Sequence, residues 1–327
     1  MDVIQYEFPP NLHQLAYALT SIPQEILSPL WWSGGLSPLV YVNPHDQSSN
    51  EQDASGDSRR HRLLGAAPLR SFADNLQANF PLALAFTHLS IHPPKALLNA
   101  IPQALHFQVD LSTGDGLNAI SDVFGQPDVV INCAALSVPR VCEMDPEAAM
   151  SINVPTTLVK WLSSFREDTL LIHLSTDQVY EGTKSFYKEE DETVPVNTYG
   201  KSKVEAEHYV SANCQNFAIL RSSIIYGPQT LSPVPKSLPI QAKQVQLILN
   251  VGGPDRLSRV QMAEAVAHVR GYNTSLIKPV SASSVDRGVK SPSDISMDIT
   301  KLIQTTGISP TSYTEGVRLT LEAEDRS

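Results

Sequence analysis

The stretch LLIHLSTDQVYEGTKSFYKEEDETVPVNTYGKSKVEAEHYV, residues 170–210, decides the fold of this 327-residue chain. It opens with an apolar run at residues 170–174, of the kind that forms a buried strand of a parallel sheet. The polar residues Ser175, Thr176 and Asp177 follow at the expected strand end, where open α/β sheets place their ligands. The stretch therefore predicts an α/β fold with a binding site at the carboxyl edge of a parallel sheet.

The end of the same stretch has helical spacing. Tyr199 and Lys203 lie one helical turn apart, so both side chains are expected on one face. A free tyrosine has a pKa of about 10, and a neighbouring ammonium favours the phenolate and lowers that pKa. With a hydroxyl from Thr176 or Ser175 to hold a carbonyl, these groups would form a ketone/alcohol redox site that needs a nicotinamide cofactor. The alternative is a surface Tyr and Lys on an amphipathic helix, which is what Y-x-x-x-K usually means when it stands alone.

Composition narrows the class of protein. At 42% hydrophobic residues the chain can bury a full α/β core, in one large domain or in a domain plus a lobe. A net charge of −10 argues against a nucleic-acid partner. The three cysteines have neither metal-site nor disulfide spacing, which fits a reducing compartment. No apolar run is long enough for a bilayer and no secretory signal is visible, so we expect a cytoplasmic protein with no membrane partner and no metal.

The flanking sequence supplies more elements. Asp145 and Pro146 predict the start of a helix that reaches Phe165 and is kinked at Pro155. The β-branched strand that precedes this helix ends in small residues, which would let a cofactor lie close to the backbone. The alternative is that the small residues allow tight packing of a helix. Apolar or alternating runs predict further strands at residues 82–86, 105–110, 128–135, 216–221 and 245–251.

Several motifs resemble those of extended short-chain dehydrogenase/reductases, in the branch of dTDP-4-dehydrorhamnose reductase, which includes the regulatory β subunit of methionine adenosyltransferase. The matching segments are residues 132–135, 142–154, 175–182, 187–191, 199–203 and 220–228. The resemblance covers roughly residues 81–241 and resumes from 247 to the C-terminus. It implies a Rossmann-like doubly wound parallel sheet that binds NADP or NAD, with Tyr199 as proton donor, Lys203 as its activator and ribose anchor, and Thr176 as the carbonyl-positioning residue.

The resemblance also implies two further sets of site residues. Gln178 departs from the aromatic residue usual at its substrate-side position, and Asn153 matches the family asparagine that orders water near the catalytic lysine. The cofactor-binding set comprises Gly65, Asp110, Leu111, Cys133, Ala134, Ala135, Asn153 and Lys203. The substrate-side set comprises Ser175, Asp177, Gln178, Ser222 and Ser223.

The chain departs from the family at both ends. Residues 59–62 read Arg-Arg-His-Arg where the family carries Gly-Gly-Thr-Gly, whose glycines let the backbone approach a pyrophosphate. Residues 233–241 run almost directly into 245–251, where the family has a helix, a strand and a second helix. We therefore expect a sheet incomplete at its first βα unit and a reduced substrate lobe. The expected division is a largely disordered extension over 1–63, an NAD(P)-binding core over 64–241 and a truncated lobe over 242–327.

Three hypotheses on function remain open. The first is an NAD(P)-dependent reductase of a nucleotide-sugar-like ketone, impaired by the lost glycines and binding its cofactor weakly. The second is a non-catalytic regulatory protein that docks on the catalytic subunit of methionine adenosyltransferase. The third is a chain that does not fold stably, because strand edges would stay unpaired where the first strand and the missing segment belong.

Overall fold

A computed structural model describes residues 39–44, 82–93, 98, 104–165, 169–226, 245–284 and 286–324. Within these residues the chain forms a seven-stranded sheet in the order β3-β2-β1-β4-β5-β6-β7. The strands are β1 (Leu39–Pro44), β2 (Leu82–His88), β3 (Leu105–Gln108), β4 (Val129–Asn132), β5 (Leu170–Thr176), β6 (Phe217–Ser222) and β7 (Gln246–Val251). The predicted α/β class is confirmed, and the strands predicted from residue 82 onward all form.

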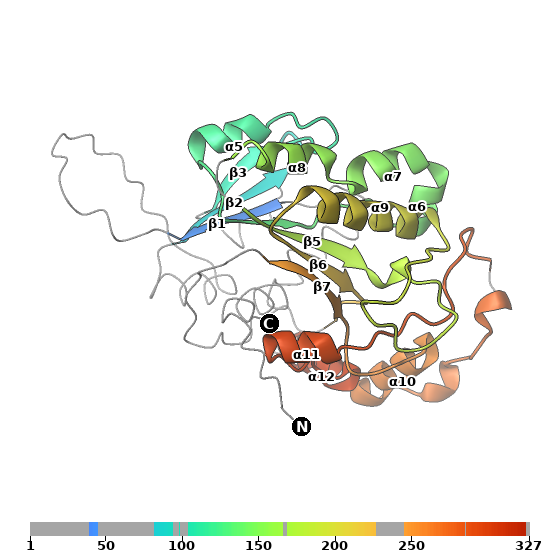
Figure 1. The fold of residues 1–327 in the computed structure, drawn as a ribbon. Coiled ribbons are helices and arrows are strands. Elements are labelled where there is room, and N and C mark those ends of the chain that lie inside the picture. Colours follow the sequence, from blue (N-terminus) through green and yellow to red (C-terminus); the bar gives the residue numbers. More distant parts are fainter. Residues whose placement is uncertain are drawn as a thin grey trace, which may run out of the picture.

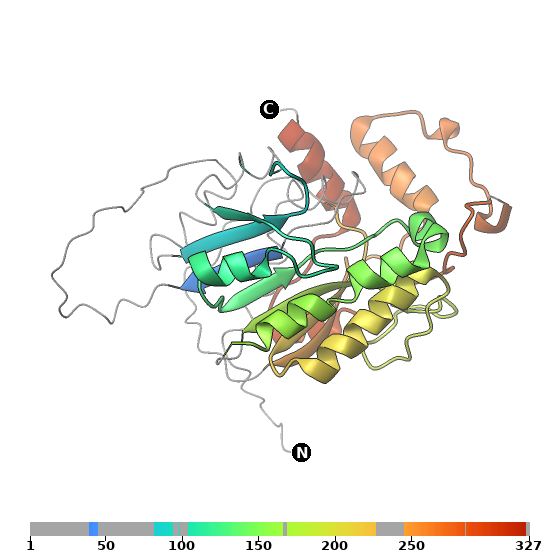
Figure 2. The ribbon, with the colours of Figure 1, turned by 90° about the horizontal axis from the view of Figure 1, so that it is seen from above.

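Helices lie on both sides of the sheet (Figures 1 and 2). One side carries α5 (Leu117–Val123), α6 (Pro139–Met144), α7 (Pro146–Asn153), α8 (Thr156–Leu162) and α9 (Thr198–Asn213). The other side carries α10 (Arg259–Arg270), α11 (Thr300–Thr306) and α12 (Tyr313–Glu324). This two-sided cover explains why the central strands β4, β5 and β6 are mostly apolar instead of alternating with polar residues.

The core follows from the two-residue period of the strands. In β5, Leu171 packs into a cluster with residues of α5, α8 and α9, such as Ile120 and Leu158. Its neighbours Leu170 and Ile172 point to the opposite side, into a cluster that includes Leu302 of α11. Both faces of β5 are therefore shielded from water, which fixes the register of this strand against β4 and β6.

Strand β1 corrects two expectations. The sequence predicts a sheet that is incomplete at its first strand, whereas Leu39–Pro44 lies between β2 and β4 in the sheet. It also runs antiparallel to both, so the sheet is mixed and not wholly parallel. Because Pro44 pairs with Leu82 at the beginning of β2, the chain leaves β1 at the edge opposite the one where β4 and β5 end. Strand β1 thus supplies no strand-turn-helix unit at the carboxyl edge.

Other expectations fall outside the described residues. These are Gly65, the Arg-Arg-His-Arg segment at 59–62, the helix expected just after it and the segment 233–241. The three domain boundaries stay predictions for the same reason.

The helix expected from Asp145 to Phe165 is split in two at the predicted proline. Asp145 caps α7, its carboxylate accepting the Ala148 N–H at 3.0 Å. Helix α7 ends at Asn153, and Pro155 is the N-cap of α8. The break arises because proline has no N–H to continue the helical bonding and clashes with the preceding turn. It leaves Asn153 pointing out of a helix end, toward α9.

Helix α9 begins close against the loop that follows β5. A Cβ added to Gly200 would collide with the Gln178 carbonyl oxygen and lie 2.8 Å from the Pro195 Cβ. Glycine to alanine within a helix ordinarily stabilises by about 0.5–1 kcal/mol, so the two effects oppose each other. A collision with backbone cannot relax cheaply, and overpacking typically costs about 1–3 kcal/mol.

We therefore expect Gly200→Ala to lower the free energy of unfolding in urea denaturation. Ser211→Ala, on the exposed face of the same helix, should be close to neutral and serves as the control. A Gly200→Ala protein more stable than the wild type would mean that α9 does not start against Gln178.

Candidate functional site

The carboxyl ends of β4, β5 and β6 meet the start of α9. A 3₁₀ turn (Asp177–Val179) follows β5 directly, and the Thr176 Oγ1 accepts the Gln178 N–H at 3.2 Å. Asn197 caps α9 by accepting the Gly200 N–H at 2.8 Å. Its amide nitrogen donates to the Gln178 Oε1 at 3.0 Å, which ties the loop after β5 to the helix. These capping hydrogen bonds thus hold the loop after β5 against the start of α9.

A small cavity lies where these elements meet. It is lined by Cys133, Ala135, Ser137, Leu174, Ser175, Tyr199 and Lys203, and its volume is about 10 Å³. The fold thus brings five of the predicted site residues to one place, and Tyr199 and Lys203 face the same cavity. The volume suits about one water molecule, whereas small-molecule sites are typically about 300–1,000 Å³.

The Thr176 side chain lies near the Tyr199 phenol. Burial raises the pKa of that phenol, Thr176 acts to lower it, and the nearby Asp177 and Cys142 raise it further. The prediction that Lys203 lowers this pKa is therefore wrong. The phenol packs in a cluster with Cys142 and Ala149, and the loss of water there outweighs any help from a cation one turn away.

Lys203 is buried and bonded to a residue that the motif analysis did not consider. Its Nζ lies 3.1 Å from the Nε2 of His173, a β5 residue with no exposed surface. Burial lowers the pKa of Lys203 to about 8, against opposing contributions from Glu207 and Cys133. Burial together with Lys203 also holds the pKa of His173 well below its usual range, so the imidazole is neutral. The signal that sequence reasoning missed was a histidine inside an otherwise apolar strand.

The residues predicted to hold the cofactor are only partly brought together. Cys133 and Ala135 line the cavity, and Ala134 lies between them at the end of β4. Asp110 follows β3, where its carboxylate accepts the Ser112 N–H at 2.8 Å, and the same serine lowers the pKa of the carboxyl. Leu111 packs in the hydrophobic core. Neither Asp110 nor Leu111 belongs to the cavity lining.

Asn153 uses its side chain within the protein. Its Oδ1 accepts the Leu136 N–H at 2.7 Å, and its amide donates to the Leu136 carbonyl at 3.0 Å and to the Ser202 hydroxyl at 2.7 Å. The side chain therefore clamps the loop after β4 to α9. This clamp fixes the distance between the cavity's two walls.

The substrate-side residues also make local contacts. The Ser175 hydroxyl donates to Glu207 Oε1 at 2.5 Å, and the Ser222 hydroxyl donates to the Ser223 carbonyl at 3.0 Å. Burial raises the pKa of Asp177 to about 7, so this carboxyl titrates near neutral pH. Gln178 is engaged by Asn197.

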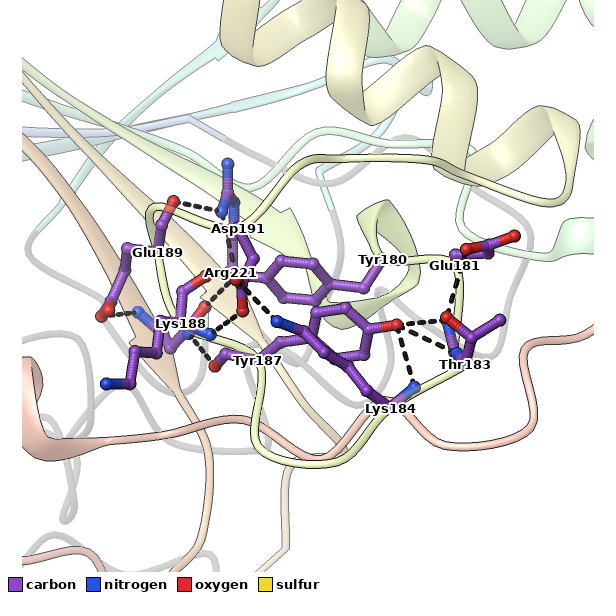
Figure 3. A network of polar contacts seen from close by, with 11 residues as sticks. Tyr180, Glu181, Thr183, Lys184, Tyr187, Lys188, Glu189, Asp191 and Arg221 are labelled. Atoms are coloured by element: carbon purple, nitrogen blue, oxygen red, sulfur yellow. Dashed lines mark hydrogen bonds and ion pairs between the residues drawn. The ribbon is translucent and has the colours of Figure 1, made fainter.

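A buried charge network supports the loop after β5 (Figure 3). Arg221 of β6 forms an ion pair with Glu207 of α9 at 2.7 Å, with both side chains almost fully buried. The same guanidinium donates to the Tyr180 hydroxyl at 2.9 Å and to the Glu189 carbonyl at 3.1 Å. Tyr180 stacks on Tyr187 with ring centroids 4.4 Å apart. An arginine within an apolar strand was the signal for such a network, because a buried charge needs partners.

A larger hollow lies beside the start of α9. Its volume is about 870 Å³, and it is lined by Glu143, Val196, Lys201, Ser284, Asp286, Arg287, Gly288, Val289 and Lys290. Basic side chains outnumber acidic ones here, although the whole chain carries a net charge of −10. With three basic and two acidic residues in its lining, the hollow is suited to a polar ligand.

Two other kinds of site were sought in the described part of the chain. No cluster of three or more His, Cys, Asp or Glu side chains there is placed to bind a metal ion. No helix in the same residues is long and apolar enough to cross a bilayer.

Sequence comparisons point to one family. Residues 96–238 match the family model of the RmlD substrate binding domain. Methionine adenosyltransferase 2 subunit beta of Pongo abelii is 27% identical over 254 residues, covering 65% of this chain and 75% of that protein. A probable low-salt glycan biosynthesis reductase of Haloferax volcanii is 38% identical over 123 residues, which are 37% of this chain and 40% of that one.

Solved structures have the same fold. A dTDP-4-dehydrorhamnose reductase of Clostridium acetobutylicum matches 71% of this chain and 94% of its own, with a TM-score of 0.55 and 19% identity. UDP-glucose 4-epimerase of Thermotoga maritima matches 79% of this chain and 94% of its own, with a TM-score of 0.60 and 17% identity. The order of motifs, the Rossmann-like sheet and the family-model match agree: residues 96–238 match the RmlD substrate-binding domain of extended short-chain dehydrogenase/reductases.

Proposed function

We propose that this chain is a non-catalytic binding subunit, similar to methionine adenosyltransferase 2 subunit beta, and not an active reductase. The observation that carries the proposal is the state of the Tyr199–Lys203 pair. The Lys203 Nζ contacts His173, and burial raises the pKa of the Tyr199 phenol. A proton donor of that kind is poorly matched to chemistry near neutral pH.

The space that a nicotinamide cofactor would need also supports a non-catalytic subunit over an active reductase. A nicotinamide would have to lie against Tyr199 and Lys203, where the cavity has a volume of about 10 Å³. Strand β1 is antiparallel and delivers no turn to this edge. The described residues therefore do not fit a dinucleotide, and we expect weak binding of NADP or NAD. When bound, such a cofactor supplies hydride chemistry, and nothing in this proposal depends on it.

The proposed partner is the catalytic subunit of a methionine adenosyltransferase. Relatives with the β-subunit name account for several of the similar sequences, including a Danio rerio protein that is 40% identical over 102 residues. The family uses this fold for reductases as well, so partner binding has to be measured directly.

The experiment mixes purified chain with a purified methionine adenosyltransferase catalytic subunit and follows the complex by analytical ultracentrifugation. We expect a stable complex with a Kd of about 1 μM or tighter, which corresponds to about −8 kcal/mol. Serum albumin at the same concentration is the control for unspecific association. Two independent sedimenting species at concentrations well above that Kd would contradict the proposal.

A reductase acting on a nucleotide-sugar-like ketone is the second candidate. Two observations favour it, namely the closeness of the Thr176 and Tyr199 side chains and the hollow near Lys201 and Lys290, whose lining has one more basic than acidic residue. The diphosphate of a nucleotide sugar would suit such a hollow. This candidate requires Tyr199 to act as the proton donor, which a single substitution tests.

A further inference from the structure

His173 lies between two nitrogen-bearing side chains. The Asn132 Nδ2 is 3.1 Å from its Nδ1, and the Lys203 Nζ is 3.1 Å from its Nε2. All three side chains are buried, with 2% or less of their surface exposed. Each contact is therefore a buried hydrogen bond, and its direction follows from the partners that the protein supplies.

The orientation of Asn132 decides that direction. Its Oδ1 accepts the Ala134 backbone N–H at 3.0 Å, which leaves the NH₂ group facing His173. An amide NH₂ can only donate, so the His173 Nδ1 has to accept. A neutral imidazole carries one N–H, which is then on Nε2 and points at Lys203. An ammonium has three donors and no lone pair, so it cannot receive that hydrogen.

We infer that the hydrogen-bond network of this structure corresponds to Lys203 as a neutral amine that accepts from His173, and that Lys203 is the group of this cavity that takes up a proton as the pH falls. The roles implied by the family motif are thereby reversed. Tyr199 keeps its proton, and Lys203 offers a lone pair where an activating cation was expected. The inference concerns the chain by itself and does not rest on the proposed binding function.

The groups around Lys203 do little to favour an ammonium. Glu207, one turn along α9, is already engaged by Arg221 and Ser175. Burial raises the pKa of the Cys133 thiol to about 12, so this side chain is uncharged near neutral pH and its support for the cation is absent. The phenol of Tyr199 is likewise protonated. Burial lowers the pKa of Lys203 to about 8, so this side chain is a neutral amine above that pH and takes up a proton as the pH falls through it.

Protonation of Lys203 would require the network to rearrange. The His173 proton would move to Nδ1, and the Asn132 amide would have to turn so that its oxygen faces the ring. The Ala134 N–H would then face an NH₂ group, and a buried donor without an acceptor is unfavourable. Lowering the pH thus acts on the end of β4 through His173.

Nuclear magnetic resonance of the whole protein tests the inference without any substitution. Labelling with ¹⁵N-histidine reports which ring nitrogen of His173 carries the proton, and ¹³Cε-lysine reports the ionisation of Lys203. We expect the Nε2–H tautomer at pH 8.5 and a Lys203 titration midpoint at or below about 8. An Nδ1–H tautomer, or a midpoint above 9, would overturn the inference.

Two variants of Asn132 separate the tautomer from simple charge effects. In Asn132→Asp the carboxylate can accept both the Ala134 N–H and the His173 Nδ1–H. The His173 Nε2 is then free to accept a hydrogen bond from the Lys203 ammonium. Asn132→Leu removes the donor that dictates the tautomer and adds no charge. The Lys203 midpoint should rise by at least one unit in both proteins, whereas a rise in Asn132→Asp alone would attribute the effect to the added charge and refute the inference.

Discussion

Replacing Arg221 with methionine should lower the free energy of unfolding by about 3–5 kcal/mol. The side chains of Arg221 and Glu207 are 5% and 4% exposed, so the substitution leaves a carboxylate buried without its cation. Methionine fills a similar volume, which limits the contribution of a cavity. The expected loss is large because desolvation of the remaining charge is no longer compensated.

The same guanidinium joins three segments of the chain. It donates to Glu207 on α9, to the Tyr180 hydroxyl and to the Glu189 carbonyl in the loop after β5 (Figure 3). Glu189 in turn accepts the Asn250 N–H of β7 at 2.8 Å. We therefore expect the variant to loosen the loop as well as to destabilise the sheet, which limited proteolysis would detect.

A double-mutant cycle with Glu207→Gln measures the pair itself. Equilibrium unfolding in urea gives the free energies, and the double variant should recover part of the loss because no buried charge is left alone. Arg318→Met is the matched control, since Arg318 pairs with Glu315 at a surface site where the side chains are 46% and 43% exposed. It should cost less than about 1 kcal/mol. Equal losses in Arg221→Met and Arg318→Met would contradict the burial argument.

Tyr199→Phe should separate the two candidate functions. The variant removes the ionisable hydroxyl and keeps the ring that packs against Cys142 and Ala149. If the chain turns over a nucleotide-sugar ketone, the chemical step should fall by about 10²–10⁴-fold, the usual contribution of a general acid. Binding to a methionine adenosyltransferase catalytic subunit should be unchanged, because the side chain is buried.

The measurement pairs reductase turnover with sedimentation of the complex. Lys203→Met is the companion variant, expected to weaken both turnover and any cofactor binding, since the family motif uses that side chain for the ribose and the phenol. A general folding defect would lower both variants alike. Wild-type turnover in Tyr199→Phe would exclude the reductase mechanism and leave the binding function standing. A measurable wild-type rate that Tyr199→Phe removes would refute the proposal of a non-catalytic subunit.

The local sequence pattern was sufficient to predict most of the fold from residue 82 onward. The apolar run before Ser175 predicts β5, and Asp145, which predicts a helix start, is the N-cap of α7 in the structure. Tyr199 and Lys203 lie one turn apart on a buried helix face, as their spacing predicts. These features depend on neighbours within a few residues along the chain, which is why a sequence alone specifies them.

The direction of β1 could not be predicted in the same way. Residues 39–44 carry no turn chemistry that sets their direction, and their place between β2 and β4 depends on partners about 40 and 90 residues away along the chain. The sheet needs an occupant at that position because open strand edges are unfavourable.

The sequence by itself determined the family, the α/β fold and the residues that meet at the end of β5. Only the tertiary structure decided their chemistry, because ionisation depends on burial and on partners distant in sequence. Lys203 meets His173, 30 residues earlier, and Glu207 meets Arg221, 14 residues later. The same Tyr-x-x-x-Lys spacing gives an acidic phenol in one environment and, with water excluded and the lysine facing His173, a phenol that keeps its proton here.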